Sequence, residues 1–140
     1  MKSADAAARV ANECLAFRSR RLARVVSRLY DDALRDEGLT VAQLVLLAAI
    51  EHEQAPSAAE LGAVLEIDKS TLCRNLRLLE SRGWIARRPS GEGRAMALGL
   101  TPAGRGRLRA AIPAWERAQE AARKRLGPEA LGALDTLLPF

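Results

Sequence analysis

A chain of 140 residues, of which 49% are hydrophobic, can bury the core of one compact domain without cross-links. Its 22 Lys and Arg residues outnumber its 17 Asp and Glu residues, so the net charge is +5 and its distribution matters more than its size. One histidine and two widely separated cysteines argue against an enzyme, a bound metal and a cofactor, because such chemistry needs clustered side chains. The cysteine content and the absence of a signal peptide predict a reducing, cytoplasmic setting.

The first third of the chain is predicted to be helical. Apolar residues recur every three or four positions from residue 5 to about residue 37, which indicates one long helix that Gly38 ends. Thr40 and Gln43 have the spacing of a capping box at the start of the next helix, 41–52. Because that helix is apolar nearly all the way round, we expect it in the middle of the core.

A short helix, a tight turn and a second helix follow. Ser57 and Glu60 predict another capping box, at the start of a helix that continues through Leu65. Asp68 is then placed to cap a helix in which three leucines fall within roughly 60° of one another and form a buried stripe. These leucines are Leu72, Leu76 and Leu79. The pair is typical of a helix-turn-helix, whose second helix enters a DNA groove.

The other side of this second helix belongs to a cationic segment. From Lys69 to Arg109 there are ten basic and two acidic residues, so the segment carries +8 and the remainder −3. Guanidinium and hydroxyl groups near a capped helix start suit phosphate oxygens and guanine edges in a major groove. A basic face alone is more often merely solvated, so the neighbouring helix and hairpin carry the inference. The candidate DNA contacts on the helix are Lys69, Ser70, Thr71, Arg74, Asn75 and Arg77.

A two-stranded hairpin is predicted after the cationic helix. Residues 84–89 and 94–100 read as strands, and "SGEG" at 90–93 has the composition of a turn. A narrow turn that bears arginines can enter a minor groove, where the negative potential is strongest. The alternative is a surface hairpin whose glycines only satisfy the turn. The arginines on which the DNA interpretation depends are Arg87, Arg88 and Arg94.

Two further helices are predicted at the end of the chain. Thr101 and Pro102 suit the N-cap and first position of a helix that runs to about residue 126, with a bend at Pro113. Gly-Pro at 127–128 separates a last helix, which carries Leu131, Leu134, Leu137 and Leu138. The predicted fold class is therefore mainly α with a small β-hairpin.

Three segments, "GLTVAQLVLLAAI", "DKSTLCRNLRLLESRGWI" and "LTPAGR", resemble in order and spacing the multiple-antibiotic-resistance regulators, the MarR family. The resemblance implies a winged helix-turn-helix lobe at 38–101 and a helical dimerisation region made of 1–37 and 102–140. It also implies a homodimer that binds palindromic double-stranded operator DNA, usually as a repressor. The family's wing motif of Asp, any residue, then Arg falls on Glu92, Gly93 and Arg94, so glutamate for aspartate is a departure.

The resemblance further implies a switch that is operated by a small aromatic effector. The effector would bind between the dimerisation helices and the DNA-binding lobe, with arginines of the first helix meeting its carboxylate. Candidate lining residues are His52, Pro113 and Trp115. Trp115 as simple core filler is the alternative, because its periodic position fits a core equally well.

A thiol switch at Cys14 or Cys73 is the other possibility left open. The reactive cysteine of the family's peroxide sensors falls on Ala16, however, and free cysteine is commonly a small packing residue. Outside this family, a helical protein-binding scaffold is the remaining alternative. No membrane association is expected, since the longest apolar run, 45–50, is too short to cross a bilayer.

Overall fold

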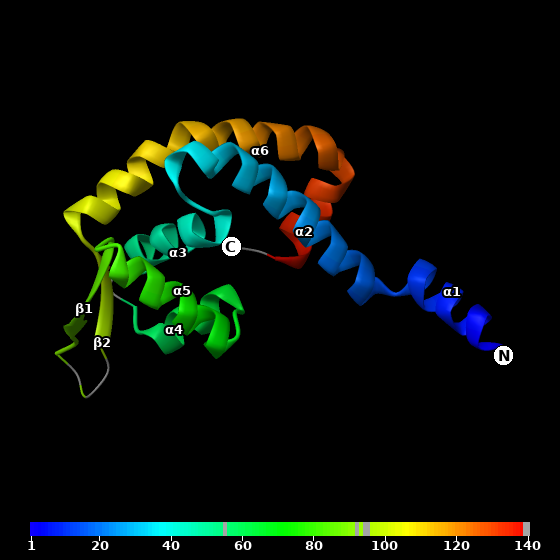
Figure 1. Ribbon diagram of the computed structural model, residues 1–140, viewed down its shortest axis with the longest axis horizontal. Helices are drawn as coiled ribbons and strands as arrows, with labels where there is room; N and C mark the ends of the chain where they lie inside the picture. Colours follow the sequence, from blue (N-terminus) through cyan, green and yellow to red (C-terminus); the bar gives the residue numbers. More distant parts are fainter. Residues whose placement is uncertain (55, 92, 94–95, 139–140) are drawn as a thin grey trace.

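The structure is a computed structural model that describes residues 1–54, 56–91, 93 and 96–138. Its elements are α1 (Ser3–Glu13), α2 (Leu15–Leu34), the 3-10 turn η1 (Arg35–Glu37), α3 (Val41–His52), α4 (Ala58–Leu65), α5 (Lys69–Ser81), β1 (Ile85–Pro89), β2 (Met96–Leu100) and α6 (Pro102–Leu137). Helices α2 and α6 pack together as an arm, and α3 to α5 with the hairpin form a lobe beside it (Figure 1). The predicted fold class is confirmed.

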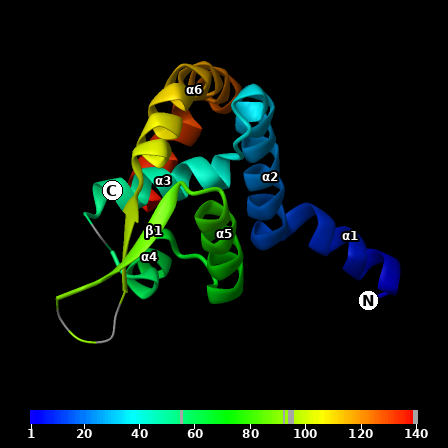
Figure 2. The ribbon, with the colours of Figure 1, turned by 60° about the vertical axis from the view of Figure 1, so that its left-hand side comes forward.

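The N-terminal region differs from the prediction of one helix over 5–37. Cys14 has extended torsion angles (φ −68°, ψ 112°), which divide the predicted helix into α1 and α2. No glycine or proline lies at the break, and α1 buries none of its residues, so no packing within the chain holds the two helices in line. Helix α1 projects away from the lobe (Figures 1 and 2). The predicted end is confirmed, because Gly38 adopts a left-handed conformation (φ 66°) after η1.

The helix caps form as their spacing predicts. The Thr40 hydroxyl accepts a hydrogen bond from the Gln43 backbone N–H at 3.3 Å, and the Gln43 side chain accepts one from the Thr40 N–H at 3.1 Å. Ser57 and Glu60 make the same reciprocal pair, at 3.2 and 2.7 Å. The hydrogen bonds from Ser57 lower the pKa of Glu60. Both capping boxes are therefore confirmed, and they fix where α3 and α4 begin.

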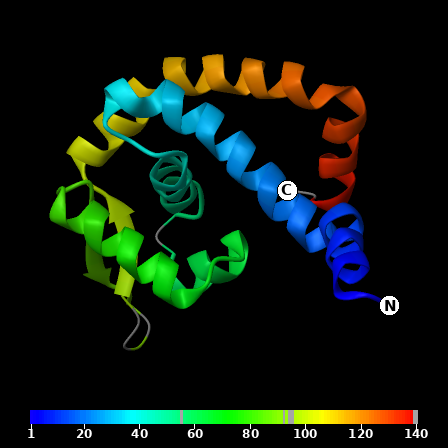
Figure 3. The same ribbon diagram turned by 45° about the vertical axis from the view of Figure 1, so that its right-hand side comes forward.

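Helix α3 runs through the middle of the fold, between the arm and the α4–α5 pair (Figure 3). Its Leu46, Leu47 and Ile50 side chains are almost completely buried. Val45 is nevertheless 42% exposed, because one side of α3 borders an open groove. Helix α5 contributes to the same core with the predicted leucine stripe, Leu72, Leu76 and Leu79.

The hairpin is antiparallel, with Ile85 opposite Leu100 and Pro89 opposite Met96. Strand β1 begins one residue later than the predicted range 84–89, and residues 94 and 95 of the second predicted strand lie outside the described residues. Leu98 is fully buried, and its backbone N–H donates to the Pro56 carbonyl at 2.8 Å. The segment before α4 therefore lies along β2, and the hairpin is attached to the lobe while its strands extend away from α6 (Figure 2).

Helix α6 begins in close contact with the base of the hairpin. The Thr101 hydroxyl accepts from the Gly104 N–H at 3.1 Å and donates to the Gly83 carbonyl at 2.6 Å. A Cβ atom on Gly104 would lie only 2.0 Å from the Trp84 carbonyl oxygen. Glycine is therefore required at this position for the first turn of α6 to approach β1 so closely.

The arm is held by contacts along α2 and α6. The Tyr30 hydroxyl donates a hydrogen bond to the Gln119 side chain, and burial raises the pKa of Tyr30. Helical torsion angles continue through Pro113 and are lost at Gly127 (φ 77°, ψ 167°). The predicted division near 127–128 is thus confirmed, and the last part of α6 folds back toward α2 (Figure 3).

Candidate nucleic-acid interface

The outer face of α5 is solvent-exposed and cationic. Lys69, Arg74 and Arg77 are exposed there, while the leucine stripe on the opposite side anchors the helix in the core. Within the described ranges of the chain, the side chains of Arg74 and Arg77 make no hydrogen bond or ion pair. A guanidinium that has no protein partner can contact a phosphate or a guanine edge without first breaking an internal interaction.

The N-terminus of α5 is capped by Asp68. Its carboxylate accepts hydrogen bonds from the Thr71 backbone N–H at 2.9 Å and from the Ser70 hydroxyl at 2.6 Å. These hydrogen bonds hold the pKa of the Asp68 carboxyl far below its usual range. Because a carboxylate already occupies the helix start, we expect contacts to an external anion from side chains of α5 and not from its free N–H groups.

Thr71 and Asn75 lie at the edge of the cationic face. Both are half-buried, and the Asn75 side-chain amide donates to the Thr71 backbone carbonyl at 3.0 Å. This hydrogen bond holds the Asn75 side chain along the helix and leaves its carbonyl oxygen and its second amide N–H available to a ligand. The structure therefore places these two candidates beside Arg74 rather than on the most exposed ridge.

Arg87 of β1 is the candidate whose surroundings differ most from the expectation. Its guanidinium forms an ion pair with Glu80 of α5 at 2.5 Å. The pair connects the first strand of the hairpin to the last turns of the cationic helix. Arg87 is thus already engaged by the protein, whereas the next residue, Arg88, is exposed and forms no ion pair with the described residues.

The turn of the hairpin is described only in part. Of the predicted wing motif, Glu92 and Arg94 lie outside the described residues, and Gly93 is an exposed turn residue with φ 78°. That torsion angle explains a glycine at this position. The described part of the hairpin contributes Arg88, which lines a hollow with Glu51, Gln54 and Arg105 on the face of β1 opposite to Arg87.

Three other arginines of the cationic segment are also engaged by the protein. Arg105 pairs with Glu51 at 2.8 Å, and the guanidiniums of Arg82 and Arg107 lie 4.9 and 5.4 Å from the centre of the Trp84 ring. No pattern of residue types or spacing indicated this arrangement, since Arg107 and Trp84 belong to different elements. The local charge of +8 therefore overstates the charge that is free to meet a polyanion.

An apolar groove of about 620 Å³ lies between α3, the end of α4 and the first part of α6. His52 lines it, together with apolar side chains that include Val45, Leu65, Leu108 and Ile112. The other two residues expected in an effector pocket, Pro113 and Trp115, are not among its lining residues. Pro113 is exposed, and Trp115 is half-buried against the core.

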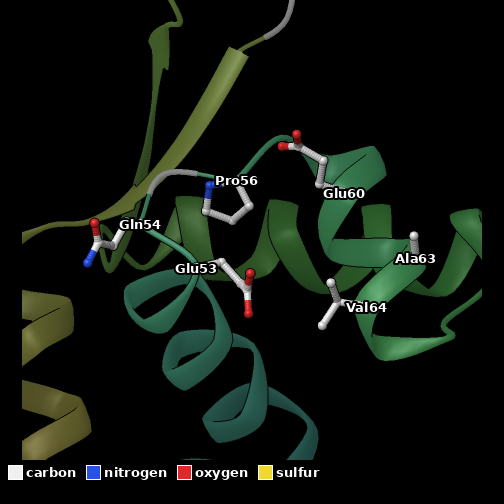
Figure 4. Close-up of a pocket in the computed structure, with 6 residues that line it drawn as sticks. All are labelled: Glu53, Gln54, Pro56, Glu60, Ala63 and Val64. Atoms are coloured by element: carbon white, nitrogen blue, oxygen red, sulfur yellow. The ribbon is translucent and has the colours of Figure 1, made fainter. Parts of the chain in front are cut away.

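A second hollow, of about 450 Å³, lies between the end of α3 and α4 (Figure 4). Glu53 and Glu60 line it, with Gln54, Pro56, Ala63 and Val64 completing the wall. Two carboxylates repel phosphate, so this hollow does not extend the cationic surface. The charged surface of the lobe is therefore divided, with α5 and the hairpin cationic and this flank acidic.

Both cysteines are free and half-buried. Cys14 lies at the break between α1 and α2, and Cys73 lies on α5 between Leu72 of the core stripe and Arg74 of the exposed face. A bulky adduct on Cys73 would therefore press between the core and the cationic face.

The chain is similar to one protein-family model and to several solved structures. Residues 37–95 match a model described as MarR family. The transcriptional regulator MosR of M. tuberculosis, solved in complex with DNA, is 31% identical, with 89% of this chain and 93% of that chain covered and a TM-score of 0.78. BpsR of Bordetella bronchiseptica, whose DNA binding is regulated by 6-hydroxynicotinic acid, is 25% identical over 90% and 91% of the two chains, with a TM-score of 0.77. Apo MarR from E. coli is 25% identical over 89% and 93%, with a TM-score of 0.71. No curated protein matches the sequence.

Proposed function

Because the chain belongs to the MarR family of DNA-binding transcriptional regulators, we propose that it is a repressor that binds a palindromic operator as a homodimer. The observation that carries the proposal is the exposed face of α5, where Arg74 and Arg77 have no partner within the described part of the chain. Residues 38–101 form the DNA-binding lobe in this proposal, and 1–37 with 102–140 form the dimerisation region.

The proposed contacts divide between two grooves. Lys69, Ser70, Arg74 and Arg77 enter the major groove with the outer face of α5, flanked by Thr71 and Asn75. Arg88 and Arg94 of the hairpin reach the adjacent minor groove. Arg87 acts indirectly in this proposal, because its ion pair with Glu80 holds the hairpin beside α5.

A salt titration tests DNA binding directly. The purified protein is titrated with a duplex that it selects from a random-sequence library and with a scrambled duplex, at increasing salt concentrations. We expect a steep loss of affinity with salt for both duplexes, because each phosphate contact contributes about 0.9 to the logarithmic slope. We also expect much tighter binding of the selected duplex. A protein without measurable affinity for any duplex at low ionic strength would refute the proposal.

A second copy of the chain is proposed to cover the exposed apolar side chains of the arm. These occur on α1, on the first half of α2 and at the end of α6: Val10, Leu15, Phe17, Leu22, Leu134, Leu137 and Leu138. An apolar surface of this extent is typical of an interface between protomers. Sedimentation equilibrium measures the stoichiometry, and a monomer at micromolar concentration would contradict a homodimer.

Release from the operator is proposed to follow binding of a small aromatic or phenolic effector in the groove beside His52. The apolar walls of the groove suit a ring, and its rim carries Glu51 and Glu53. The Glu51 carboxylate is paired with Arg105, so it is the Glu53 carboxylate that favours a neutral phenol over an anionic acid. A thermal-shift comparison of phenol with benzoate tests this preference, and Ile112→Glu, which puts a charge into the apolar wall, should abolish the response.

A thiol switch is the second candidate for release, favoured by the position of Cys73 on α5. Intact-mass measurement after mild peroxide treatment, with a parallel DNA-binding assay of the wild type and Cys73→Ser, distinguishes the two. Unmodified Cys73 with unchanged binding would exclude it. Cys14→Ser separates any contribution of the other thiol.

A further inference from the structure

Three segments that are distant in sequence meet at Trp84. This residue lies between the end of α5 and β1 and is packed against the core. The guanidinium of Arg82, directly after α5, lies 4.9 Å from the ring centre, and the guanidinium of Arg107, on the second turn of α6, lies 5.4 Å from it. Both distances are within the range of a cation–π interaction.

The same two arginines also converge on the turn that ends the α2 segment. Arg107 donates to the Glu37 carbonyl at 3.1 Å, and Arg82 donates to the Gly38 carbonyl at 3.1 Å. These carbonyls belong to adjacent residues, the last residue of η1 and the glycine that caps it. We call this cluster, made of Arg82, Trp84, Arg107 and the carbonyls of Glu37 and Gly38, the junction.

Arg82 extends the junction to α3. Its Nη1 atom also lies 3.4 Å from the side-chain oxygen of Gln43, which is buried and completes the capping box of α3. The junction therefore connects the end of the cationic helix α5 to α3, to α6 and to the η1 turn that follows α2. Only a guanidinium combines a flat face for stacking with several N–H donors in one plane, so lysine cannot make both contacts equally well.

The junction lies at the opposite end of α5 from its capped start. From Lys69 to Arg82 the helix rises about 20 Å, at about 1.5 Å per residue. Arg82 and Arg107 already donate to backbone carbonyls and stack on Trp84, which distinguishes them from the unpartnered Arg74 and Arg77. They are therefore suited to fixing the direction of α5 relative to the arm rather than to contacting DNA.

We infer that Arg82 and Arg107 are positioning residues, which hold α5 at a fixed angle to the α2–α6 arm through Trp84 and so set the separation of the two DNA-binding helices in the dimer. The inference rests on the proposed function, because the arm carries the dimer contacts and α5 carries the DNA contacts. A rigid connection between them lets a dimer distinguish the spacing of two half-sites.

The experiment compares Arg107→Gln, Arg107→Lys and Arg82→Gln with the wild type on the selected duplex. We expect an affinity loss of about tenfold, the upper range for mutations that disturb coupling between two parts of a protein. The salt slope should remain that of the wild type, because no phosphate contact is removed. Arg109→Gln is the matched control, since it removes an exposed arginine two residues further along α6 that has no partner within the described part of the chain, and it should bind nearly as the wild type does.

A second measurement reports geometry independently of affinity. One base pair is inserted between the half-sites of the duplex, which moves them apart by about 3.4 Å and rotates them. The wild type should lose affinity strongly on the longer duplex, and the junction variants should lose much less. All titrations are made below the thermal unfolding of each variant, followed by circular dichroism, so that reduced stability does not imitate weaker binding.

The outcomes separate this inference from the proposed function. A wild type that binds no duplex refutes the function itself. A wild type that binds normally, with junction variants that keep its affinity and its spacing penalty, overturns the inference alone. A salt slope reduced by about 0.9 in Arg107→Gln would also overturn it, because it would make Arg107 a phosphate contact. Full affinity in Arg107→Lys would do the same, by showing that charge without stacking is sufficient.

Discussion

Two sets of arginines, one on the middle turns of α5 and one beside its C-terminal end, have opposite surroundings. Arg74 and Arg77 are exposed and unpartnered among the described residues, whereas Arg82 and its neighbour in space, Arg107, each stack on Trp84 and donate to a backbone carbonyl. The residue type is the same, but one set is available to an external anion and the other holds the lobe to the arm. Net charge along a segment therefore does not identify a DNA-binding surface until the internal partners of each cation are known.

The largest effect is expected where the junction region is most tightly packed, at Gly104. A Cβ there meets the Trp84 carbonyl at 2.0 Å, and a backbone oxygen cannot move aside as a flexible side chain can. We expect Gly104→Ala to lower the free energy of unfolding by about 3 kcal/mol or more, measured by urea denaturation.

Gly106→Ala is the control for this prediction. A Cβ at Gly106 meets no atom within 4 Å, so the substitution should raise the free energy of unfolding by about 0.5–1 kcal/mol through its helix propensity. Equal stabilities of the two variants would contradict the close approach of α6 to β1.

Substitutions on the exposed face of α5 should change DNA binding strongly and stability only slightly. Arg74→Ala should change the free energy of unfolding by less than about 0.5 kcal/mol, because its side chain is exposed and has no partner in the described ranges. Its discrimination between the selected duplex and single-base variants should fall by about 1–3 kcal/mol, the size of a bidentate base contact. Competition binding measures the relative affinities for these duplexes. Unaltered relative affinities would show that Arg74 makes no base contact.

Arg87 is intermediate between the two sets, because it is partly exposed and paired with Glu80. The two side chains are 34% and 28% exposed, so solvent screens much of their attraction. A double-mutant cycle with Arg87→Gln and Glu80→Gln should give a coupling energy of up to about 1 kcal/mol in unfolding. Arg88→Gln combined with Glu80→Gln should show no coupling, and equal coupling in both cycles would argue against the specific pair.

The smallest effect concerns the cap of α5 and depends on pH. The hydrogen bonds from Ser70 and Thr71 lower the pKa of Asp68 in the folded protein. Its stabilising contribution is therefore complete above the unfolded pKa, about 3.9, and is lost as the pH falls through the lower, folded value. Asp68→Asn keeps a capping oxygen but does not titrate there.

Comparing the wild type with Asp68→Asn measures the contribution of the Asp68 charge to stability. The difference between their urea midpoints should be constant from pH 7 to about pH 5 and should shrink below about pH 4. A difference that stays constant down to pH 3 would show that the charge of Asp68 does not contribute.

Local features of the fold could be predicted from the sequence. The capping pairs Thr40–Gln43 and Ser57–Glu60 depend on residues three positions apart, and the burial of the α5 leucines depends on helical periodicity. These features are decided within one turn of helix, so their residue types and spacing were sufficient. The division of α6 at Gly127 was predictable for the same reason.

Features that depend on distant partners could not be predicted in this way. The pairing of Arg105 with Glu51 and the stacking of Arg107 on Trp84 join different elements, and neither leaves a periodic pattern. A count of charges along the sequence therefore assigned such arginines to one cationic surface. The break at Cys14 escaped prediction because the periodicity continues across it while the packing does not.

The isolation of α1 has a practical consequence for measuring association. A helix of 11 residues that buries none of its side chains is too short to persist in water by itself, so its amide hydrogens should exchange rapidly in a lone protomer. Burial of α1 against another chain would slow that exchange. The protection of α1 amides against deuterium exchange, followed by mass spectrometry over a dilution series, would thus report the association constant without a fluorescent or covalently attached probe.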